Sequence, residues 1–189
     1  RPADPAWLTA LETQMAEHGA AIDENRRALI DRLVIHLAEQ SDGPFARPVL
    51  ALEGWTGKEG DLRSALFESR GRDRAAARTL VGPHRADLIV THAAKGQAAA
   101  LCSTGEQKAL LLSLILAHAE IIGAQSGRPL LILLDEVAAH LDPVRRGALF
   151  ERLRATGGQV WMTGTEPSLF EGLGAATRLH VAHGHVEAD

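Results

Sequence analysis

The chain has 189 residues, of which 46% are hydrophobic, and a formal net charge of −4. This length suffices for one domain with a sizeable core and a smaller appendage. The weakly acidic balance excludes a general attraction to nucleic acid, so contact with DNA requires a local basic patch. The single cysteine excludes an internal disulfide framework and fits a reducing compartment, so we expect a cytoplasmic protein.

The longest apolar stretch, residues 109–122, contains Ser113, His118 and Glu120. It is too short and too polar for a membrane span, so we expect no membrane partner. The N-terminus lacks the charged-then-apolar pattern of a signal peptide. Because the chain begins with Arg1 and not with methionine, we expect it to be a piece of a longer protein.

Residues 5–40 carry apolar residues at helical spacing in two runs, with Gly19 between them. The runs predict an antiparallel helical hairpin or part of a longer helical arm. Three arginines of the second run form either a solvated helix face or a surface that faces DNA. The apolar positions are Leu8, Leu11, Met15, Ile22, Leu29, Leu33 and Leu37, and the arginines are Arg26, Arg27 and Arg32.

A break rich in Gly, Pro and Ser at residues 41–48 is the predicted domain boundary, with a helical portion over 1–47 and an α/β portion over 48–189. A short strand is predicted at 49–53. A helix is predicted at 61–69. Its inward-facing residues are expected to be Leu62, Leu66 and Phe67, and a basic cluster follows at Arg70, Arg72, Arg74 and Arg78.

Strands alternate with helices through the rest of the chain. This alternation predicts an α/β fold, with a mainly parallel sheet flanked by helices. The predicted strands are 88–91, 98–102, 130–134, 159–163 and 178–182, with a turn at Lys95-Gly96 joining the first two and a closing hairpin at 178–186; the predicted helices are 105–123, 144–154 and one near Pro167.

Two acidic residues, Asp135 and Glu136, close the apolar run 130–134. Consecutive apolar residues predict a strand buried on both faces, and acids at its carboxyl end face the crevice where α/β sheets bind ligands. Asp135 can hold Mg²⁺ through water, and Glu136 can orient and deprotonate a water. The alternative is an ordinary strand end capped by acids.

Ser103 stands where a predicted strand turns into the long apolar helix. The unpaired N–H groups of a first helical turn carry the positive end of the helix dipole, and Gly105 lets the backbone approach a ligand closely. The segment can therefore bind a phosphate. A plain N-cap, for which serine is also preferred, is the alternative.

In this order, the segment 103–108, the acid pair and the later Asp142 resemble the signature motif, Walker B motif and D-loop of the ABC-type ATPases. Transporters of that superfamily usually have proline after the acid pair, and here Val137 follows. The run 135–142, DEVAAHLD, is more similar to the SMC and RecF branch.

A second motif narrows the resemblance to the RecF family. The segment 82–85, GPHR, followed by Asp87, resembles the GPHR-D-L stretch of that family. Upstream, Asp73 and Thr79 match its R-x-x-D…T-x-x-GPHR pattern. Either Arg70 or Arg72 can be the first arginine of this pattern. The departures are Glu106, where the family usually has glutamine, and Glu136, where many members have aspartate.

The resemblance covers essentially the whole chain and implies the C-terminal half of a RecF-type protein: the C-terminal lobe of an ABC-type ATPase head with part of a helical arm or lid. It implies ATP and Mg²⁺ in the full-length protein, and an ATP-dependent homodimer. In such a dimer the signature segment of one protomer would cap the γ-phosphate held by the other. That segment includes Ser103, Gly105, Gln107 and Lys108.

The same resemblance implies a role for each remaining candidate. Asp135 would hold Mg²⁺ through water, Glu136 would activate the attacking water, and Asp142 would cross the dimer interface. The implied work is DNA repair and replication on double-stranded and gapped DNA, with RecR and RecO as partners and RecA loading as the indirect result. Contacts to DNA or to the ATPase interface would come from His84, Arg85 and Arg74.

The phosphate-binding P-loop, G-x-x-x-x-G-K-[ST], does not occur in the sequence. The only Gly-Lys pair, Gly57-Lys58, has neither the spacing nor the hydroxyl residue. In the family the P-loop lies upstream, before the position of Arg1, so we expect no appreciable ATP affinity for this chain alone. Two alternatives remain: an SMC-like ATPase of chromosome organisation, or a non-hydrolysing interaction fragment.

Overall fold

A computed structural model describes residues 4–40, 43–55, 57 and 59–188. The chain divides into two compact units, residues 1–41 with 46–102 and residues 42–45 with 103–189. The predicted domain boundary after residue 47 stays a prediction. The Gly57-Lys58 pair lies partly outside the described residues, because Lys58 is not among them.

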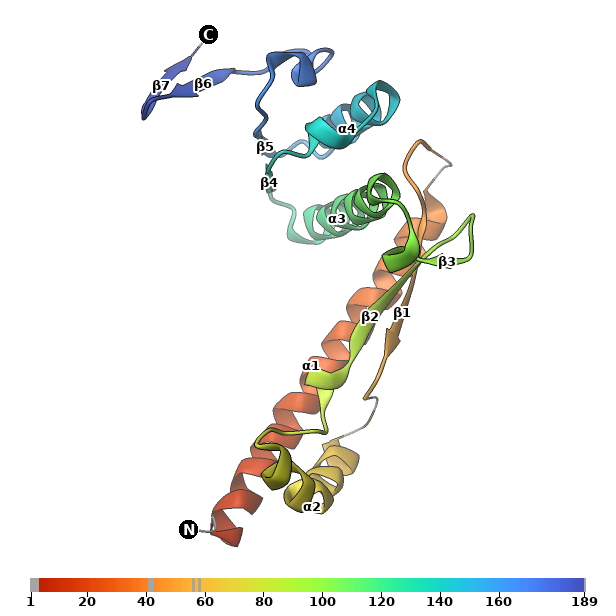
Figure 1. The fold of residues 1–189 in the computed structure, drawn as a ribbon, viewed down its shortest axis with the longest axis vertical. Helices are drawn as coiled ribbons and strands as arrows, with labels where there is room; N and C mark the ends of the chain where they lie inside the picture. Colours follow the sequence, from red (N-terminus) through yellow and green to blue (C-terminus); the bar gives the residue numbers. More distant parts are fainter. Residues whose placement is uncertain (1–3, 41–42, 56, 58, 189) are drawn as a thin grey trace. The chain divides into compact units, whose positions relative to one another are not determined.

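The first unit is built on one long helix and an antiparallel sheet (Figure 1). Strands β1 and β2 pair along their whole lengths, with Leu50 opposite Val90, and β2 pairs with the short β3. The first unit thus contains both helices and a sheet, in agreement with the predicted α/β class. Its elements are α1 (Pro5–Glu39), β1 (Pro48–Glu53), α2 (Glu59–Ala76), η1 (Pro83–Arg85), β2 (Asp87–His92), β3 (Gln97–Ala98) and η2 (Ala99–Leu101).

Helix α1 corrects the predicted helical hairpin, because it runs unbroken through Gly19. Gly19 is buried, and a Cβ there would lie 2.6 Å from Leu62 Cδ2 and 3.3 Å from Pro83 Cδ. This glycine therefore serves close packing against α2 and η1 and not a turn. The prediction for Leu33 and Leu37 was right, since both are buried.

Helix α2 buries Leu62 and Leu66 against Ala16 of α1, as predicted. Phe67 was predicted to face inward and instead is 59% exposed. The helix also extends further than predicted, to Ala76, so most of the basic cluster lies on it and not in a loop. Strand β3 is shorter than predicted, because residues 99–101 form a 3-10 turn.

The second unit contains a parallel strand pair covered by two helices (Figure 1). Its core is formed by residues of α3, β4 and α4, among them Leu116, Leu134 and Phe150. The elements are α3 (Thr104–Ser126), β4 (Leu131–Leu134), η3 (Ala138–His140), α4 (Pro143–Ala155), β5 (Gln159–Met162), η4 (Pro167–Phe170), β6 (Leu179–Ala182) and β7 (His185–Ala188).

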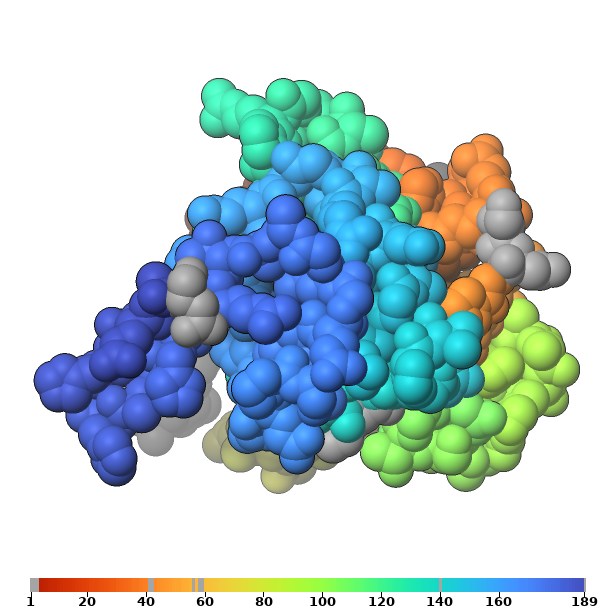
Figure 2. Space-filling view, turned by 90° about the horizontal axis from the view of Figure 1, so that it is seen from above, coloured from red at the N-terminus to blue at the C-terminus, as the bar shows by residue number. Residues whose placement is uncertain are grey.

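The pair β4–β5 is parallel, as predicted, and β6 and β7 form the predicted closing hairpin. The other strand pairs in the described residues are antiparallel, so a mainly parallel sheet is not formed within this chain. The residues of α4 and those after β5 lie side by side at the surface in Figure 2. Their packing is fixed by Arg154 of α4, which donates to the carbonyls of Gly172 and Leu173. Phe170 and Leu173 also pack on the core.

Strand β4 is buried on one face only. Ile132 and Leu134 enter the core, whereas Leu131 and Leu133 are 61% and 71% exposed. Burial on both faces was predicted and is wrong within this chain, because α3 and α4 pack on the same face as Ile132 and Leu134. The uncovered face continues onto β5 through Trp161, the register partner of Leu133, which is 49% exposed.

Among the described residues, α3 alone is long and apolar enough to cross a membrane by length and composition. At 23 residues it is longer than the apolar stretch on which the sequence prediction rested. Core helices of water-soluble proteins meet the same criterion, and α3 places Leu112 and Leu116 in the core of the second unit.

Candidate nucleotide site and its supports

The acid pair lies directly after β4, where the neighbouring strand β5 also ends. Thr163, the residue after β5, donates its N–H to Leu134 O at 3.0 Å and its hydroxyl to Asp135 Oδ1. The N–H of Glu136 donates to Thr163 Oγ1 at 3.0 Å. The parallel register thus places a hydroxyl between the two acidic residues.

Glu136 has a left-handed backbone, with φ of 53°. Non-glycine residues adopt this region uncommonly, and such residues concentrate at functional sites. Asp135 and Glu136 are both exposed. Within the described part of the chain, neither the Glu136 carboxylate nor Asp135 Oδ2 has a hydrogen-bond partner, so both can accept from a ligand or a water.

These carboxylates fit a magnesium ion that is bound mainly by phosphate and water. No group of three or more His, Cys, Asp or Glu suited to a metal occurs among the described residues. Mg²⁺ keeps several waters and commonly takes only one or two carboxylates together with substrate phosphates. Asp135 Oδ2 is therefore the protein oxygen best placed to face such an ion, directly or through water.

The signature segment begins α3 with a capping box. Ser103 Oγ accepts the N–H of Glu106 at 3.4 Å, and the N–H of Ser103 donates to Glu106 Oε2 at 3.0 Å. The Ser103 hydroxyl also donates to Glu106 Oε2, at 2.9 Å. The N-cap geometry that the sequence allowed is thus present. A phosphate contact stays a prediction.

The other signature residues lie in the first turns of α3. A Cβ on Gly105 would meet nothing within 4 Å, so packing within this chain does not require glycine there. Gln107 is exposed and Lys108 is half-buried. This part of the helix surface is therefore open to a ligand or a partner.

Asp142 is the N-cap of α4. Its carboxylate accepts the N–H of Arg145 at 2.9 Å and lies 3.5 Å from Arg145 Nη1. Pro143 occupies the first turn, where its missing N–H costs nothing. The side chain remains 48% exposed, so the cap does not prevent a contact across an interface.

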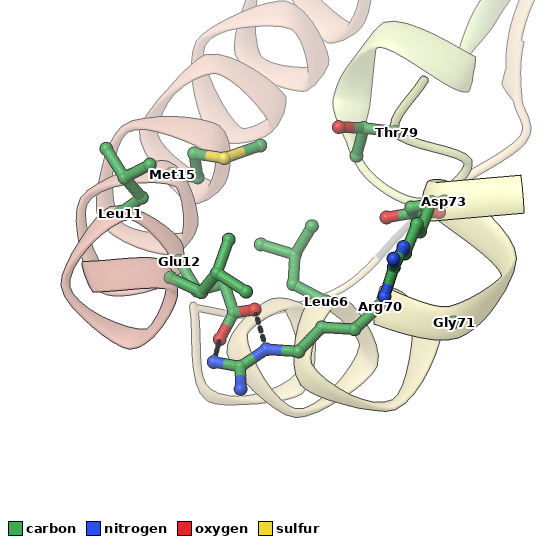
Figure 3. Close-up of a pocket in the computed structure, with 10 residues that line it drawn as sticks. Leu11, Glu12, Met15, Leu66, Arg70, Gly71, Asp73 and Thr79 are labelled. Carbon is green, nitrogen blue, oxygen red and sulfur yellow. Dashed lines mark hydrogen bonds and ion pairs between the residues drawn. The ribbon is translucent and has the colours of Figure 1, made fainter. Parts of the chain in front are cut away.

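In the first unit, the structure assigns the first place of the R-x-x-D pattern to Arg70. Arg70 Nε and Nη2 donate to the two carboxylate oxygens of Glu12, at 2.5 and 2.8 Å (Figure 3). The hydrogen bond to Glu12 raises the pKa of Arg70 above its usual value. Arg70 also lies over the Phe67 ring, 4.6 Å from its centroid. Arg72 is exposed.

The aspartate of the pattern, Asp73, holds the loop that leads to the GPHR segment. It accepts from Ser69 Oγ at 2.8 Å and from the N–H of Leu80 at 3.0 Å. His84 Nε2 donates to Thr79 O at 2.9 Å, and Arg26 of α1 donates to Pro83 O at 2.7 Å. The GPHR turn is thus fixed from α1, from α2 and from its own loop.

A pocket of about 670 Å³ lies between α1 and α2 (Figure 3). Leu11 and Met15 line it from α1, and Leu66 and Arg70 from α2. Arg74 also lines this pocket, whereas His84 and Arg85 lie in η1. His84 and Arg85 are exposed, as is Arg74. Their predicted contact to DNA or to an ATPase interface stays a prediction.

Three residues that hold these sites in place were not predicted from the sequence. Thr163 bonds to the acid pair, Glu106 caps α3, and the buried Glu12 pairs with Arg70. The serine with glutamate three residues later was a readable capping-box signal. Thr163 and Glu12 gave no local signal, because each acts on residues distant in the sequence.

The fold and site define the class: α3 with its capped N-terminus, β4 with its acid pair and α4 form an α/β unit in the order expected for the C-terminal lobe of an ABC-type ATPase head. No protein-family model matches the chain. Curated sequences do. The chain is 49% identical over 196 residues to the DNA replication and repair protein RecF of Brucella abortus (strain 2308), and 46% identical over 200 residues to that of Rhizobium johnstonii.

These matches cover 97% of this chain and 51–52% of the relatives, so the chain spans about half the length of the curated relatives it matches. A solved structure of the recombination mediator RecF with ATP covers the whole chain, at a TM-score of 0.74 and 22% identity, which supports the fold. The expected relationship is confirmed: the chain corresponds to about half of a RecF-family protein.

Proposed function

We propose that this chain is the part of a RecF-type ATPase that supplies the water-activating acid pair and the signature segment. The observation that carries the proposal is the arrangement after β4. Asp135 and Glu136 are exposed and tied to Thr163, and each keeps carboxylate oxygens without a partner in the described chain. A purely structural cap would use those oxygens within the chain.

In the full-length protein, Asp135 would hold Mg²⁺ directly or through water, and Glu136 would accept a proton from the attacking water. Mg²⁺ supplies charge neutralisation on the phosphates when it is bound. Ser103, Gly105, Gln107 and Lys108 face the γ-phosphate held by a second protomer, and Asp142 lies at the same interface. ATP binding therefore drives formation of a homodimer.

The uncovered face of β4–β5 supports the proposal that this chain carries only part of the ATPase site. Leu131, Leu133 and Trp161 are exposed on one face of a parallel pair, a type of sheet that is normally covered on both faces. The curated relatives are about twice as long as the chain. We assign this face to contact with the remainder of the full-length protein, which also carries the P-loop.

The biological role that follows is recombination mediation in DNA replication and repair, in the cytoplasm. RecF is named as a DNA replication and repair protein in the curated relatives, and as a recombination mediator of the RecFOR pathway in the solved structures. For this protein we propose binding to double-stranded and gapped DNA through the exposed Arg74, His84 and Arg85. RecR and RecO act as partners and assist RecA loading.

The trans contact is tested by Ser103→Arg in the full-length protein. The long, positively charged arginine side chain replaces the serine hydroxyl at the N-cap of α3. We expect this change to abolish ATP-dependent dimerisation, measured by sedimentation velocity. Gln125→Arg, an exposed position near the other end of α3, is the matched control and is expected to dimerise normally. Unchanged dimerisation of Ser103→Arg would refute the role of the signature segment.

A further inference from the structure

Among the described residues, Thr163 is the one whose side chain bonds to both members of the acid pair. A hydroxyl has one donor and two acceptor positions. Here the donor goes to Asp135 Oδ1, and one acceptor position receives the N–H of Glu136 at 3.0 Å. No other residue type of the same size can fill both positions, since valine has neither donor nor acceptor.

The backbone of Thr163 is itself fixed by the sheet. Its N–H donates to Leu134 O at 3.0 Å, which continues the ladder between β4 and β5 by one residue. The hydroxyl therefore starts from a rigid position at the end of the parallel pair. Side chains on rigid elements hold a site more accurately than side chains on loops.

Two consequences follow for the acid pair. The bond to Oδ1 fixes the orientation of the Asp135 carboxylate and leaves Oδ2 for the ligand. The bond from the Glu136 N–H stabilises a residue whose φ of 53° is otherwise unfavourable. Both acids are thereby held in position by one side chain.

We propose that Thr163 is a positioning residue for the Asp135–Glu136 pair, which sets the Mg²⁺ affinity of the site and the placement of the attacking water. This inference rests on the proposed ATPase function. Residues that orient metal ligands through a hydrogen bond typically change metal affinity or activity by 10–100-fold when they are replaced. We therefore expect a loss of about tenfold or more when the hydroxyl is removed.

The test compares Thr163→Val, which removes the hydroxyl at equal size, with Thr163→Ser, which keeps it. Thr165→Val, an exposed threonine two residues later, is the matched control. The first readout is the Mg²⁺ concentration that gives half-maximal ATP-dependent dimerisation of the full-length protein in sedimentation velocity. The second is amide hydrogen exchange at Glu136, measured without nucleotide.

Thr163→Val is expected to raise the Mg²⁺ midpoint about tenfold and to speed exchange at Glu136, while Thr163→Ser and Thr165→Val stay near wild type. If Thr163→Val fails to fold, Thr163→Ala replaces it, because the side chain is exposed and its loss leaves no cavity. A Mg²⁺ midpoint unchanged from that of Thr165→Val overturns the positioning role.

The positioning role of Thr163 and the ATPase function can be refuted separately. If wild-type protein dimerises with Mg-ATP and Thr163→Val does so at the same Mg²⁺ concentration, the positioning role fails and the ATPase function stands. If wild-type protein shows no response to Mg-ATP, the ATPase function fails and the positioning role falls with it. Exchange at Glu136 then still reports whether the hydroxyl bonds to the backbone.

Discussion

The two units use their polar residues in opposite ways. In the first unit, the motif residues Arg70, Asp73 and His84 bond to partners within the chain, namely Glu12, Leu80 and Thr79. In the second unit, Asp135 and Glu136 are exposed and keep oxygens without a described partner.

This difference indicates which polar groups are available to a ligand. Polar groups that are buried or fully bonded mainly stabilise a conformation, whereas charged groups held rigidly but left partly unbonded are available to a ligand. By this criterion the main role of the R-x-x-D…GPHR pattern is to stabilise the turn at 82–85 and the loop before it. The acid pair after β4 is the part that we propose to be reactive.

The largest expected effect on stability comes from Arg70→Ala, because it leaves the nearly buried Glu12 without its cation. We expect the free energy of unfolding in chemical denaturation to fall clearly further than in the control variant. Arg72→Ala, an exposed neighbour on α2, is the control and should change stability by less than about 0.5 kcal/mol. Equal effects of the two variants would refute a stabilising role of the Arg70–Glu12 ion pair.

The double variant Glu12→Gln/Arg70→Ala sharpens the same point. Removing both charges is less costly than leaving one buried and unpaired. We therefore expect the double variant to be more stable than Arg70→Ala alone. The coupling free energy is the loss of stability in the double variant minus the sum of the losses in Glu12→Gln and Arg70→Ala. A double variant that loses the full sum of the single effects would show that the pair is not coupled.

A smaller effect is expected from Gly19→Ala. Alanine normally favours a helix over glycine by about 1 kcal/mol, but here its Cβ would lie 2.6 Å from the buried Leu62. Overpacking typically costs about 1–3 kcal/mol, so we expect net destabilisation in thermal unfolding. Gly71→Ala on α2 has open space around the new Cβ and is expected to stabilise the chain. Stabilisation by both variants would contradict the close packing of α1 on α2.

The smallest effect on stability concerns the cap of α4. Asp142→Ala removes the acceptor for the Arg145 N–H and is expected to cost about 1 kcal/mol. Asp142→Asn keeps the cap and removes the charge, so its unfolding free energy should stay near wild type. If Asp142→Asn nevertheless weakens the ATP-dependent dimer of the full-length protein, the carboxylate has the predicted role across the interface. An unaffected dimer assigns Asp142 to capping alone.

Most elements of the second unit follow from the sequence because their signals are local. The apolar run 130–134 closes with acids and forms β4 at Leu131–Leu134, and the predicted helix 144–154 forms α4 at Pro143–Ala155. Hydrophobic period and turn residues decide such elements within a short window.

The first helix was misread for a physical reason. Its buried face includes Glu12, Gly19 and Asp23, so apolar spacing does not mark that face. Leu11 and Met15, which looked like core residues, are 38% and 43% exposed. The buried Glu12 cannot be recognised from periodicity, because its pairing partner, Arg70, lies on another helix.

The central support of the site, Thr163, was also beyond local reasoning. Its bonds to Asp135 and Glu136 depend on the register of β4 against β5, where Leu134 lies beside Met162. A sequence shows that two strands exist but does not give their register. The candidate acids could therefore be named in advance, whereas the residue that orients them could not.

The proposed activation of water by Glu136 in a RecF-type ATPase is tested by Glu136→Gln in the full-length protein. We expect ATP hydrolysis to fall by about 10²-fold or more, while ATP-dependent dimers form and persist in sedimentation velocity. Glu151→Gln on the exposed face of α4 is the control and should hydrolyse normally. Hydrolysis at the wild-type rate by Glu136→Gln would contradict the account.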